Sequence, residues 1–341
     1  MTDYPSLNQR PVLVTGGTGF IGRHLVRRLV ETGARVRVLV RRSSHLNALL
    51  DVANRMEIFP GDLKAANSLD AAVKGIDTVF HLGAATRENW EQAEQASVLG
   101  TGCLLKKART RGVQRFVYVS SMAVYDYGRM SPGAVVDENS PLEFHPQLRN
   151  AYARSKCEAE ALARSYLHAS DMGLTIVRPG AVYGPGGPAH IPPTIRLIGS
   201  KVALAIGGGQ RQVPLLHVED LIDALLQIAS APIAAGKIYN VVSDTPVSEA
   251  DYISVYSQAR GRQIFVIPLP RWPFFVLANM FDFVQKRTRN NPQSDVFRSL
   301  RRVTNPVVFS AAAIQKELGW RVRTGMEDGI QTTLENRNAA A

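Results

Sequence analysis

Three side chains in the middle of the chain have the types needed to transfer a proton: Ser121, Tyr152 and Lys156. Tyr152 and Lys156 are four residues apart in a segment rich in helix-forming residues, so they share one face of a predicted helix. An ammonium group beside a phenol favours the phenolate, and we therefore expect Lys156 to lower the pKa of Tyr152. A tyrosine tuned in this way can act as a general acid or base.

Ser121 follows an apolar run, Phe116 to Val119, that predicts a buried strand. Open α/β sheets bind ligands at the carboxyl ends of their strands. We therefore expect the Ser121 hydroxyl to hold a substrate oxygen between itself and Tyr152.

A glycine turn near the N-terminus has the spacing needed to hold phosphates. The residues from Val12 to Glu31 read as a short buried strand, a turn, and a helix with one apolar face. Gly16 permits a tight turn, Gly19 lets a phosphate approach the backbone, and Gly22 lets the helix pack closely on its strand. A pyrophosphate would lie on the helix N-terminus.

The end of the second predicted strand indicates which dinucleotide binds. Sites that prefer NAD place an acidic residue there for the ribose 2′-hydroxyl, whereas arginine accommodates a 2′-phosphate. This chain has Arg41 and Arg42 after Val40, which favours NADPH, with NAD as the alternative. An exposed basic loop without a ligand would explain the same residues. In the third-strand region, Asp62 is placed to accept from the adenine amine.

Length and composition are those of an ordinary globular enzyme: 341 residues, 45% hydrophobic and 20% charged. The first ten residues lack the apolar core of a secretory signal, and the only two cysteines, Cys103 and Cys157, fit a reducing compartment, so we expect a cytoplasmic protein. The net charge of +11 is spread along the chain without a nucleic-acid-binding motif. We expect no nucleic-acid partner and no metal, since His217, Glu219 and Asp220 have the spacing of a helix start.

Strands and helices alternate regularly as far as Pro179, which predicts a doubly wound parallel α/β sheet of the Rossmann type. We expect residues 1–180 to form the dinucleotide-binding domain, with 214–247 returning to it. Residues 181–213 and 248–341 are expected to form a smaller substrate lobe.

Seven motifs in order resemble the extended short-chain dehydrogenase/reductase family, which includes the NAD-dependent epimerases and dehydratases. They are Thr15 to Gly22, Gly61-Asp62-Leu63, His81 to Ala85, Tyr118 to Ser121, Tyr152 with Lys156, Arg178-Pro179 with Val182 to Gly186, and His217 to Asp220. The resemblance implies that Ser121, Tyr152 and Lys156 form a catalytic triad. It also implies cofactor contacts by Gly16, Gly19, Phe20, Ile21, Gly22, Leu63, Leu82, Gly83, Ala84, Ser97, Pro179 and the triad residues Tyr152 and Lys156.

Departures from the family pattern narrow the set of reactions that this chain is expected to catalyse. Ser97 stands where the family commonly has asparagine, and Val213 stands where sugar-nucleotide enzymes usually carry an arginine for the diphosphate. Met122-Ala123 replaces the Asp-Glu pair of the dehydratases, which argues against sugar dehydration as the reaction of this chain. The second strand looks more like those of the dihydroflavonol reductase and 3β-hydroxysteroid dehydrogenase branches, which act on apolar substrates.

An apolar segment, residues 272–284, is too short to span a bilayer of ~30 Å. It predicts either a lid or core helix of the small lobe or a helix at a membrane interface, with basic residues up to position 302 at the headgroups. Homodimers of the family pair through the helix that begins near Trp90 and the helix that carries Tyr152, but monomers also occur, so the resemblance leaves the oligomeric state open.

Three functions remain open from the sequence. The first is an NAD(P)-dependent oxidoreductase that moves a hydride between nicotinamide and a ketone or secondary alcohol of a mostly apolar substrate. The second is a nucleotide-sugar epimerase that uses the same triad and retains its NAD. The third is a dinucleotide-sensing protein without turnover, which the presence of all three triad residues disfavours.

Overall fold

The computed structural model describes residues 4–85, 89–168, 171–188, 192–199, 201–288 and 296–338. Its centre is a seven-stranded sheet in the order β12-β7-β5-β4-β1-β2-β3, and every neighbouring pair in it is parallel. The strands are β1 (Pro11–Thr15), β2 (Arg35–Val40), β3 (Glu57–Pro60), β4 (Thr78–His81), β5 (Arg115–Val119), β7 (Gly173–Pro179) and β12 (Ile238–Val241). The predicted doubly wound α/β sheet is confirmed.

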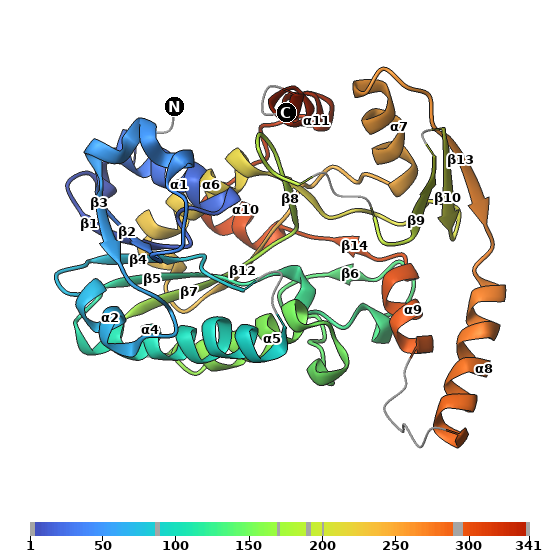
Figure 1. Ribbon diagram of the computed structural model, residues 1–341, viewed down its shortest axis with the longest axis horizontal. Helices are drawn as coiled ribbons and strands as arrows, with labels where there is room; N and C mark the ends of the chain where they lie inside the picture. The colour runs from blue at the N-terminus through green and yellow to red at the C-terminus, as the bar shows by residue number, and fades with distance from the viewer. Residues whose placement is uncertain are drawn as a thin grey trace.

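Helices cover both faces of this sheet (Figure 1). On one face, apolar side chains of α1 (Phe20–Glu31), α6 (Val218–Ser230) and α10 (Ala312–Leu318) join one buried core. On the other face, α2 (Ala66–Ala72), α4 (Gly100–Thr110) and α5 (Ala151–Arg164) contribute to a second core. Central strands such as β1 are buried on both sides, which is why Val12, Leu13 and Val14 read as an unbroken apolar run.

The helix expected from Trp90 to Arg111 is interrupted. It consists of α3 (Trp90–Ala93), a π-helical stretch (Glu94–Leu99) and α4. Such stretches widen a helix locally and are frequent at functional sites. Ser97 lies within this one.

A second, smaller sheet has the order β13-β10-β9 and consists of β9 (Ile195–Ile198), β10 (Val202–Ile206) and β13 (Phe265–Leu269). Its inner face packs with α7 (Glu249–Ala259) and α11 (Met326–Asn338) in a separate core. Two-stranded pairs join the parts of the molecule: β8 (Ala181–Tyr183) with β11 (Leu215–His217), and β6 (Val135–Val136) with β14 (Val308–Phe309).

Segments from the second half of the chain also contribute to the central sheet and its core. β12, which lies within residues 214–247, is the outermost strand beside β7. Val307, Ile314 and Trp320, which lie within residues 248–341, pack into the core beside α1 and α6. Trp320 is fully buried and donates its indole N–H to the Asp220 carbonyl at 3.1 Å.

The apolar segment 272–284 forms most of α8 (Trp272–Thr288), which runs along the edge of the molecule and is followed by α9 (Val296–Thr304) (Figure 1). Most of its large side chains are exposed, so α8 is not a core helix. Part of the basic stretch up to position 302, residues 289–295, lies outside the described residues.

Candidate active site

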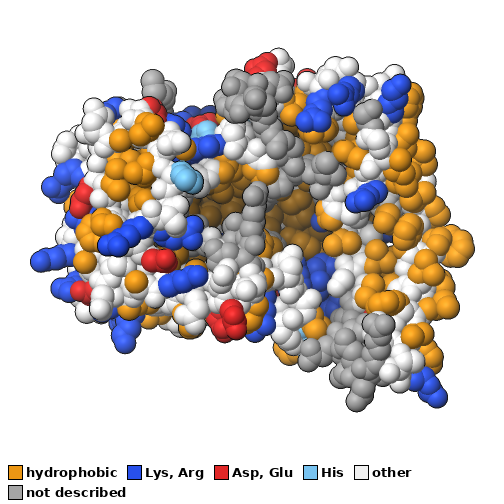
Figure 2. Space-filling model, viewed as in Figure 1, with side chains coloured by type: hydrophobic (Ala, Val, Ile, Leu, Met, Phe, Trp, Pro, Cys, Tyr) orange, Lys and Arg blue, Asp and Glu red, His pale blue; other side chains and the backbone are white. Residues whose placement is uncertain are grey.

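A cavity of about 1720 Å³ opens at the carboxyl ends of β1, β4, β5 and β7. Figure 2 shows the molecule hollowed between the central sheet and the smaller lobe. Pockets for drug-sized ligands measure about 300 to 1,000 Å³, so this one has room for a dinucleotide and a substrate together. Both the glycine turn and the triad line it.

The glycine turn forms one wall of the cavity. Gly16 has φ +73°, and a Cβ on it would lie 2.8 Å from the Gly83 nitrogen. A Cβ on Gly22 would lie 2.1 Å from the Gly16 carbonyl oxygen, because the helix packs closely against the turn. The tight turn expected at Gly16 and the close helix packing expected at Gly22 therefore both require a residue without a side chain.

Gly19 is the N-cap of α1 and has no side chain to cap the helix. The N–H groups of the first helical residues, Phe20, Ile21 and Gly22, have no partner within a helix, and these residues line the cavity. The positive end of the helix dipole lies at the same place. The turn thus fits the pyrophosphate of a dinucleotide.

A chain of hydrogen bonds holds the turn against β4. The Thr101 hydroxyl donates to the Ser97 carbonyl at 2.5 Å, so it accepts from Nε2 of His81 at 2.8 Å. Nδ1 of His81 then accepts from the Thr15 hydroxyl at 2.6 Å, and that hydroxyl accepts from the Gly83 N–H at 3.1 Å. His81 is fully buried, and both of its ring nitrogens have a partner in this chain of hydrogen bonds.

Ser97 supports the site from behind. Its hydroxyl accepts from the Ala85 N–H at 2.8 Å, which fixes the small-residue turn after β4. Ser97 is buried and does not line the cavity, whereas Leu82, Gly83 and Ala84 do. Ser97 thus holds the turn that carries these cavity-lining residues, while its expected contact with the cofactor stays a prediction.

Of the two arginines after β2, the structure brings one to the cavity. Arg41 lines it together with Ser44 and Arg27, whereas Arg42 does not. Arg27 is held by Asp51, with Nε donating at 2.7 Å, and by the Ala48 carbonyl at 2.6 Å. The remaining expected cofactor residues, Asp62, Leu63 and Pro179, also line the cavity.

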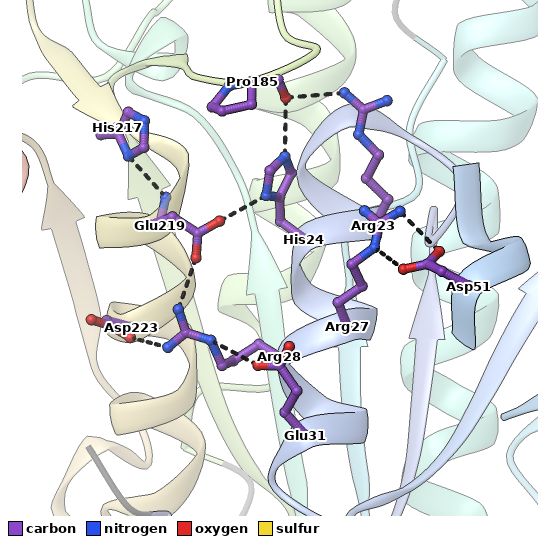
Figure 3. A network of polar contacts seen from close by, with 10 residues as sticks. All are labelled: Arg23, His24, Arg27, Arg28, Glu31, Asp51, Pro185, His217, Glu219 and Asp223. Atoms are coloured by element: carbon purple, nitrogen blue, oxygen red, sulfur yellow. Dashed lines mark hydrogen bonds and ion pairs between the residues drawn. The ribbon is translucent and has the colours of Figure 1, made fainter. Parts of the chain in front are cut away.

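Helix α1 is tied to the start of α6 by a polar network (Figure 3). His24 bridges Glu219, at 2.7 Å from Nδ1, and the Pro185 carbonyl, at 3.1 Å from Nε2. Arg28 pairs with Glu219 at 2.8 Å and Asp223 at 2.9 Å. His217 is the N-cap of α6, as its spacing predicted, and accepts from the Glu219 N–H. The network fixes the loop after β8 over the glycine turn.

The three predicted catalytic residues line the same cavity. Ser121 follows β5 and accepts from the Ala123 N–H at 3.1 Å, while Tyr152 and Lys156 project from α5. Asn150 is the N-cap of α5, and its side chain accepts from the Ala153 N–H. This cap fixes the first turn of the helix, which carries Tyr152.

The sequence predicted that Lys156 lowers the pKa of Tyr152, but in the structure this pKa is raised. Burial raises the pKa of Tyr152, and a hydrogen bond with Ser121 opposes that rise. The Lys156 ammonium donates instead to the Val119 carbonyl at 2.8 Å. Burial lowers the pKa of Lys156 to about 8, although the nearby Glu160 carboxylate acts in the opposite direction. The amine thus titrates near neutral pH.

A buried ion pair holds α5 on the sheet. Arg178 on β7 donates through Nε to Glu160 of α5 at 3.1 Å, and both side chains are almost fully buried. Glu160 also accepts from the Ser120 hydroxyl, and Arg178 donates to the Tyr125 hydroxyl at 2.7 Å. Because Ser120 precedes Ser121, and Glu160 is one turn after Lys156, this network sets the spacing within the triad.

Three arginines lie on the lobe side of the cavity, and sequence reasoning missed two of them, Arg149 and Arg302. Arg149, Arg211 and Arg302 line it, and each is paired with a buried carboxylate. Arg149 and Arg302 contact Glu143, both at 2.9 Å, and Arg211 contacts Glu249 at 3.2 Å. Their separation in sequence gave no signal that they converge.

No group of three or more metal-ligating side chains occurs in the described part of the chain. Cys157 is partly buried, and burial raises the pKa of its thiol to about 12, so it is a poor nucleophile.

Comparison with known proteins identifies the family. The model of the NAD-dependent epimerase/dehydratase family matches residues 12–241. The chain belongs to this family. The extended short-chain dehydrogenases/reductases that compose it are NAD-dependent epimerases, dehydratases and reductases, and they act on small molecules.

Individual relatives of this family member span nearly the whole chain. UDP-glucose 4-epimerase of Vibrio cholerae is 26% identical over 96% of this chain and 95% of its own length. The 4-hydroxy-2-methyl-3-oxo-4-farnesyl-3,4-dihydroquinoline-1-oxide ketoreductase of Stigmatella aurantiaca is 29% identical over 93% of both chains. The structure of dTDP-glucose 4,6-dehydratase from Streptomyces venezuelae, with NAD bound, has a TM-score of 0.70 at 23% identity, covering 96% of this chain and 97% of that one. The structural likeness supports the fold.

Proposed function

We propose that this family member is an NADPH-dependent oxidoreductase, which moves a hydride between nicotinamide and a ketone or secondary alcohol of a mostly apolar substrate. The observation that carries the proposal is that Ser121, Tyr152 and Lys156 line the same cavity as the glycine turn. A proton donor, an orienting hydroxyl and a phosphate-binding turn in one cavity are the parts that a carbonyl reductase needs.

The cofactor would be held along the carboxyl ends of the central strands. The α1 N-terminus would hold the pyrophosphate, Asp62 and Leu63 the adenine half, and Lys156 a ribose hydroxyl of the nicotinamide half, since all of them line the cavity. When bound, the dinucleotide supplies or accepts the hydride. The remaining chemistry belongs to the chain's own side chains.

In the reducing direction, Tyr152 donates its phenolic proton to the substrate oxygen as negative charge develops there. Ser121 donates a hydrogen bond to the same oxygen and keeps it beside Tyr152. Lys156 in its charged form stabilises the resulting phenolate. In the oxidising direction the same groups act in reverse, with Tyr152 as the base.

The preference for NADPH rests on Arg41, which lines the cavity next to Ser44. The residues after β2 include no acidic side chain that would accept from a ribose 2′-hydroxyl and repel a phosphate. A guanidinium fork and a hydroxyl suit a phosphate monoester.

The apolar substrate is supported by apolar residues on the cavity wall. Met122, Ala123, Val182, Pro214 and Val303 line the cavity. The relative from Stigmatella aurantiaca, a ketoreductase by name, has a farnesyl group in the name of its substrate. A carbonyl on an apolar ring or chain would place its oxygen at Ser121 and its body against this wall.

The proposal is tested by NADPH consumption with a panel of apolar cyclic ketones, using protein first checked by absorbance for carried-over dinucleotide. We expect protein free of dinucleotide to oxidise NADPH with at least one of these ketones. Tightly retained NAD without NADPH consumption would reject the proposal.

One observation favours a second function, a nucleotide-sugar epimerase. The Nε atoms of Arg211 and Arg302 are buried and have no hydrogen-bond partner among the described residues. Both arginines line the cavity, where the diphosphate of a UDP-sugar would supply acceptors. Arg211 would then replace the arginine absent at Val213. Retained NAD together with tight UDP-sugar binding that Arg211→Ala abolishes would establish this function instead.

We also propose a cytoplasmic homodimer paired through α4 and α5. Residues 181–213 and the part of the segment from 248 onward that does not pack beside α1 and α6 would form the substrate lobe. Leu99, just before α4, and Leu162, on α5, are exposed apolar residues. Light scattering of wild-type protein and of the Leu99→Glu/Leu162→Glu variant tests the pairing. A dimeric wild type and a monomeric variant are expected, and a wild type that stays monomeric rejects it.

A further inference from the structure

The smaller sheet is apolar on both faces. Its inner face, including Ala203 and Ala205, is buried in the lobe's core. A sheet with one buried face normally presents polar side chains on the other. Here the pairing of β10 with β13 and β9 places Arg196 on the outward face among apolar residues: Ile198, Val202, Leu204, Phe265 and Ile267. Ile198 and Phe265 are more than half exposed.

Helix α8 continues this apolar surface (Figure 2). Only two residues separate it from β13. Its large outward side chains are each at least half exposed: Trp272, Val276, Leu277, Met280, Phe281, Phe283 and Val284. We name these residues and the outward residues of the small sheet the apolar outer face. Apolar patches of this extent mark sites of interaction.

The opposite side of α8 is fixed to α9. Asp282 is buried and accepts from the N–H groups of Val296 and Phe297 at 3.0 and 2.9 Å. The rings of Phe275 and Phe297 lie 5.2 Å apart. The orientation of α8 is therefore set by α9, and the outward direction of its apolar side is part of the fold.

The charges around the apolar outer face have one sign. Residues 195–206 and 260–288 contain seven basic residues and a single acidic one, Asp282. Asp282 is the residue buried against α9, whereas Arg196, Lys201 and Arg287 are exposed. More than half of the chain's excess of positive charge thus lies in these two segments.

We propose that the apolar outer face docks this protein on the surface of an anionic lipid bilayer. Large apolar side chains would enter the boundary between headgroups and acyl chains, and the arginines and lysine would contact lipid phosphates. No helix among the described residues is long and apolar enough to cross a membrane. We place α8 in the plane of the interface because its apolar side chains are exposed on one side and α9 packs on the other. A second copy of the chain fits less well, because a symmetric contact would place the same basic residues opposite one another.

Docking in this orientation brings the cavity close to the membrane. Arg302 and Val303 of α9 line the cavity, and α9 packs directly on α8. A substrate dissolved in the bilayer would reach the cavity past α9. The docking itself does not depend on the proposed reaction, since it rests on surface residues remote from the triad.

The test is flotation of the purified full-length chain with vesicles of phosphatidylcholine alone or with about one-third phosphatidylglycerol. We expect the protein to float with the anionic vesicles and to be released as salt is raised. The variant Leu277→Ser/Phe281→Ser/Phe283→Ser should lower the partition coefficient by on the order of tenfold or more, because it removes three apolar side chains that would enter the bilayer.

The matched control is Leu50→Ser/Ile233→Ser, which removes two side chains that are also more than half exposed but lie outside the apolar outer face. It should float like the wild type, and thermal unfolding should show that all variants are folded. Failure of the wild type to float with anionic vesicles overturns the proposal. So does a wild-type dimer that the triple variant converts to a monomer, since the face would then be a contact between copies.

Discussion

Tyr152 is the residue whose removal most directly separates chemistry from binding. In Tyr152→Phe the proton donor is lost while the ring that lines the cavity remains. We expect kcat to fall by about 10²- to 10⁴-fold with NADPH binding nearly unchanged, because general acid catalysis contributes that much. Tyr166→Phe, just beyond the end of α5, should leave kcat at the wild-type value. Steady-state kinetics and titration calorimetry would show both effects, and full activity of Tyr152→Phe would remove Tyr152 from the mechanism.

Lys156 predicts the pH dependence of the reaction. Burial lowers its pKa to about 8, so the charged form that stabilises the phenolate predominates below that pH and is lost above it. In the reducing direction we expect kcat/KM to be constant below about pH 8 and to decline above it. A pH series at subsaturating substrate measures this, and a profile that stays flat well above that pH would contradict it.

The elements around the site are held by buried polar groups, of which the pair between α5 and β7 is the most buried. In Glu160→Gln the Arg178 guanidinium keeps its position but loses its counter-charge. We expect the free energy of unfolding to fall by about 3 to 5 kcal/mol, the usual effect of breaking a buried pair. Glu158→Gln on the same helix, whose partner Arg154 is partly exposed, should change it by less than about 1 kcal/mol. Equal losses in urea unfolding would show that the buried pair has no special part in holding α5.

His81 couples the glycine turn to pH. Burial lowers its pKa from 6.5 to about 3, so the folded protein keeps it neutral while the unfolded chain binds a proton below pH 6.5. The stability that His81 confers is therefore complete above pH 6.5 and is lost as the pH falls toward 3. The slope is about 1.4 kcal/mol per pH unit for one proton.

The comparison that isolates this effect is between the wild type and His81→Gln, which keeps a polar side chain between Thr15 and Thr101. Denaturant unfolding at several pH values should give a shallower slope for His81→Gln, whatever its absolute stability. Identical slopes in the two proteins would mean that His81 is not the titrating group.

At the scale of the whole molecule, local sequence patterns predicted the central domain well. The strand, turn and helix around Gly16 are adjacent in sequence, so the spacing of their hydrophobic residues predicts them directly. Tyr152 and Lys156 were found because they share one helix turn, and Ser121 because a strand ends beside it. The family motifs added the order of these parts.

The features that sequence reasoning missed depend on contacts between distant segments. Arg302 enters the cavity from α9 and pairs with Glu143, more than 150 residues earlier, and no local pattern predicts such a contact. Similarly, Arg41 and Arg42 are indistinguishable as neighbours in sequence, and only the fold places one of them at the cavity. The pKa of Tyr152 was predicted from one neighbour, but burial is the larger influence.

The same difference between Arg41 and Arg42 provides the most direct test of the account. The measurement is isothermal titration of dinucleotide-free protein with NADPH and with NADH, for the wild type, Arg41→Ala and Arg42→Ala. We predict that the wild type binds NADPH at least about tenfold more tightly than NADH, since a phosphate with a guanidinium partner gains about 1.5 to 3 kcal/mol. Arg41→Ala should abolish the preference and Arg42→Ala should retain it. Equal or tighter binding of NADH by the wild type would contradict the assignment of this cavity to NADPH.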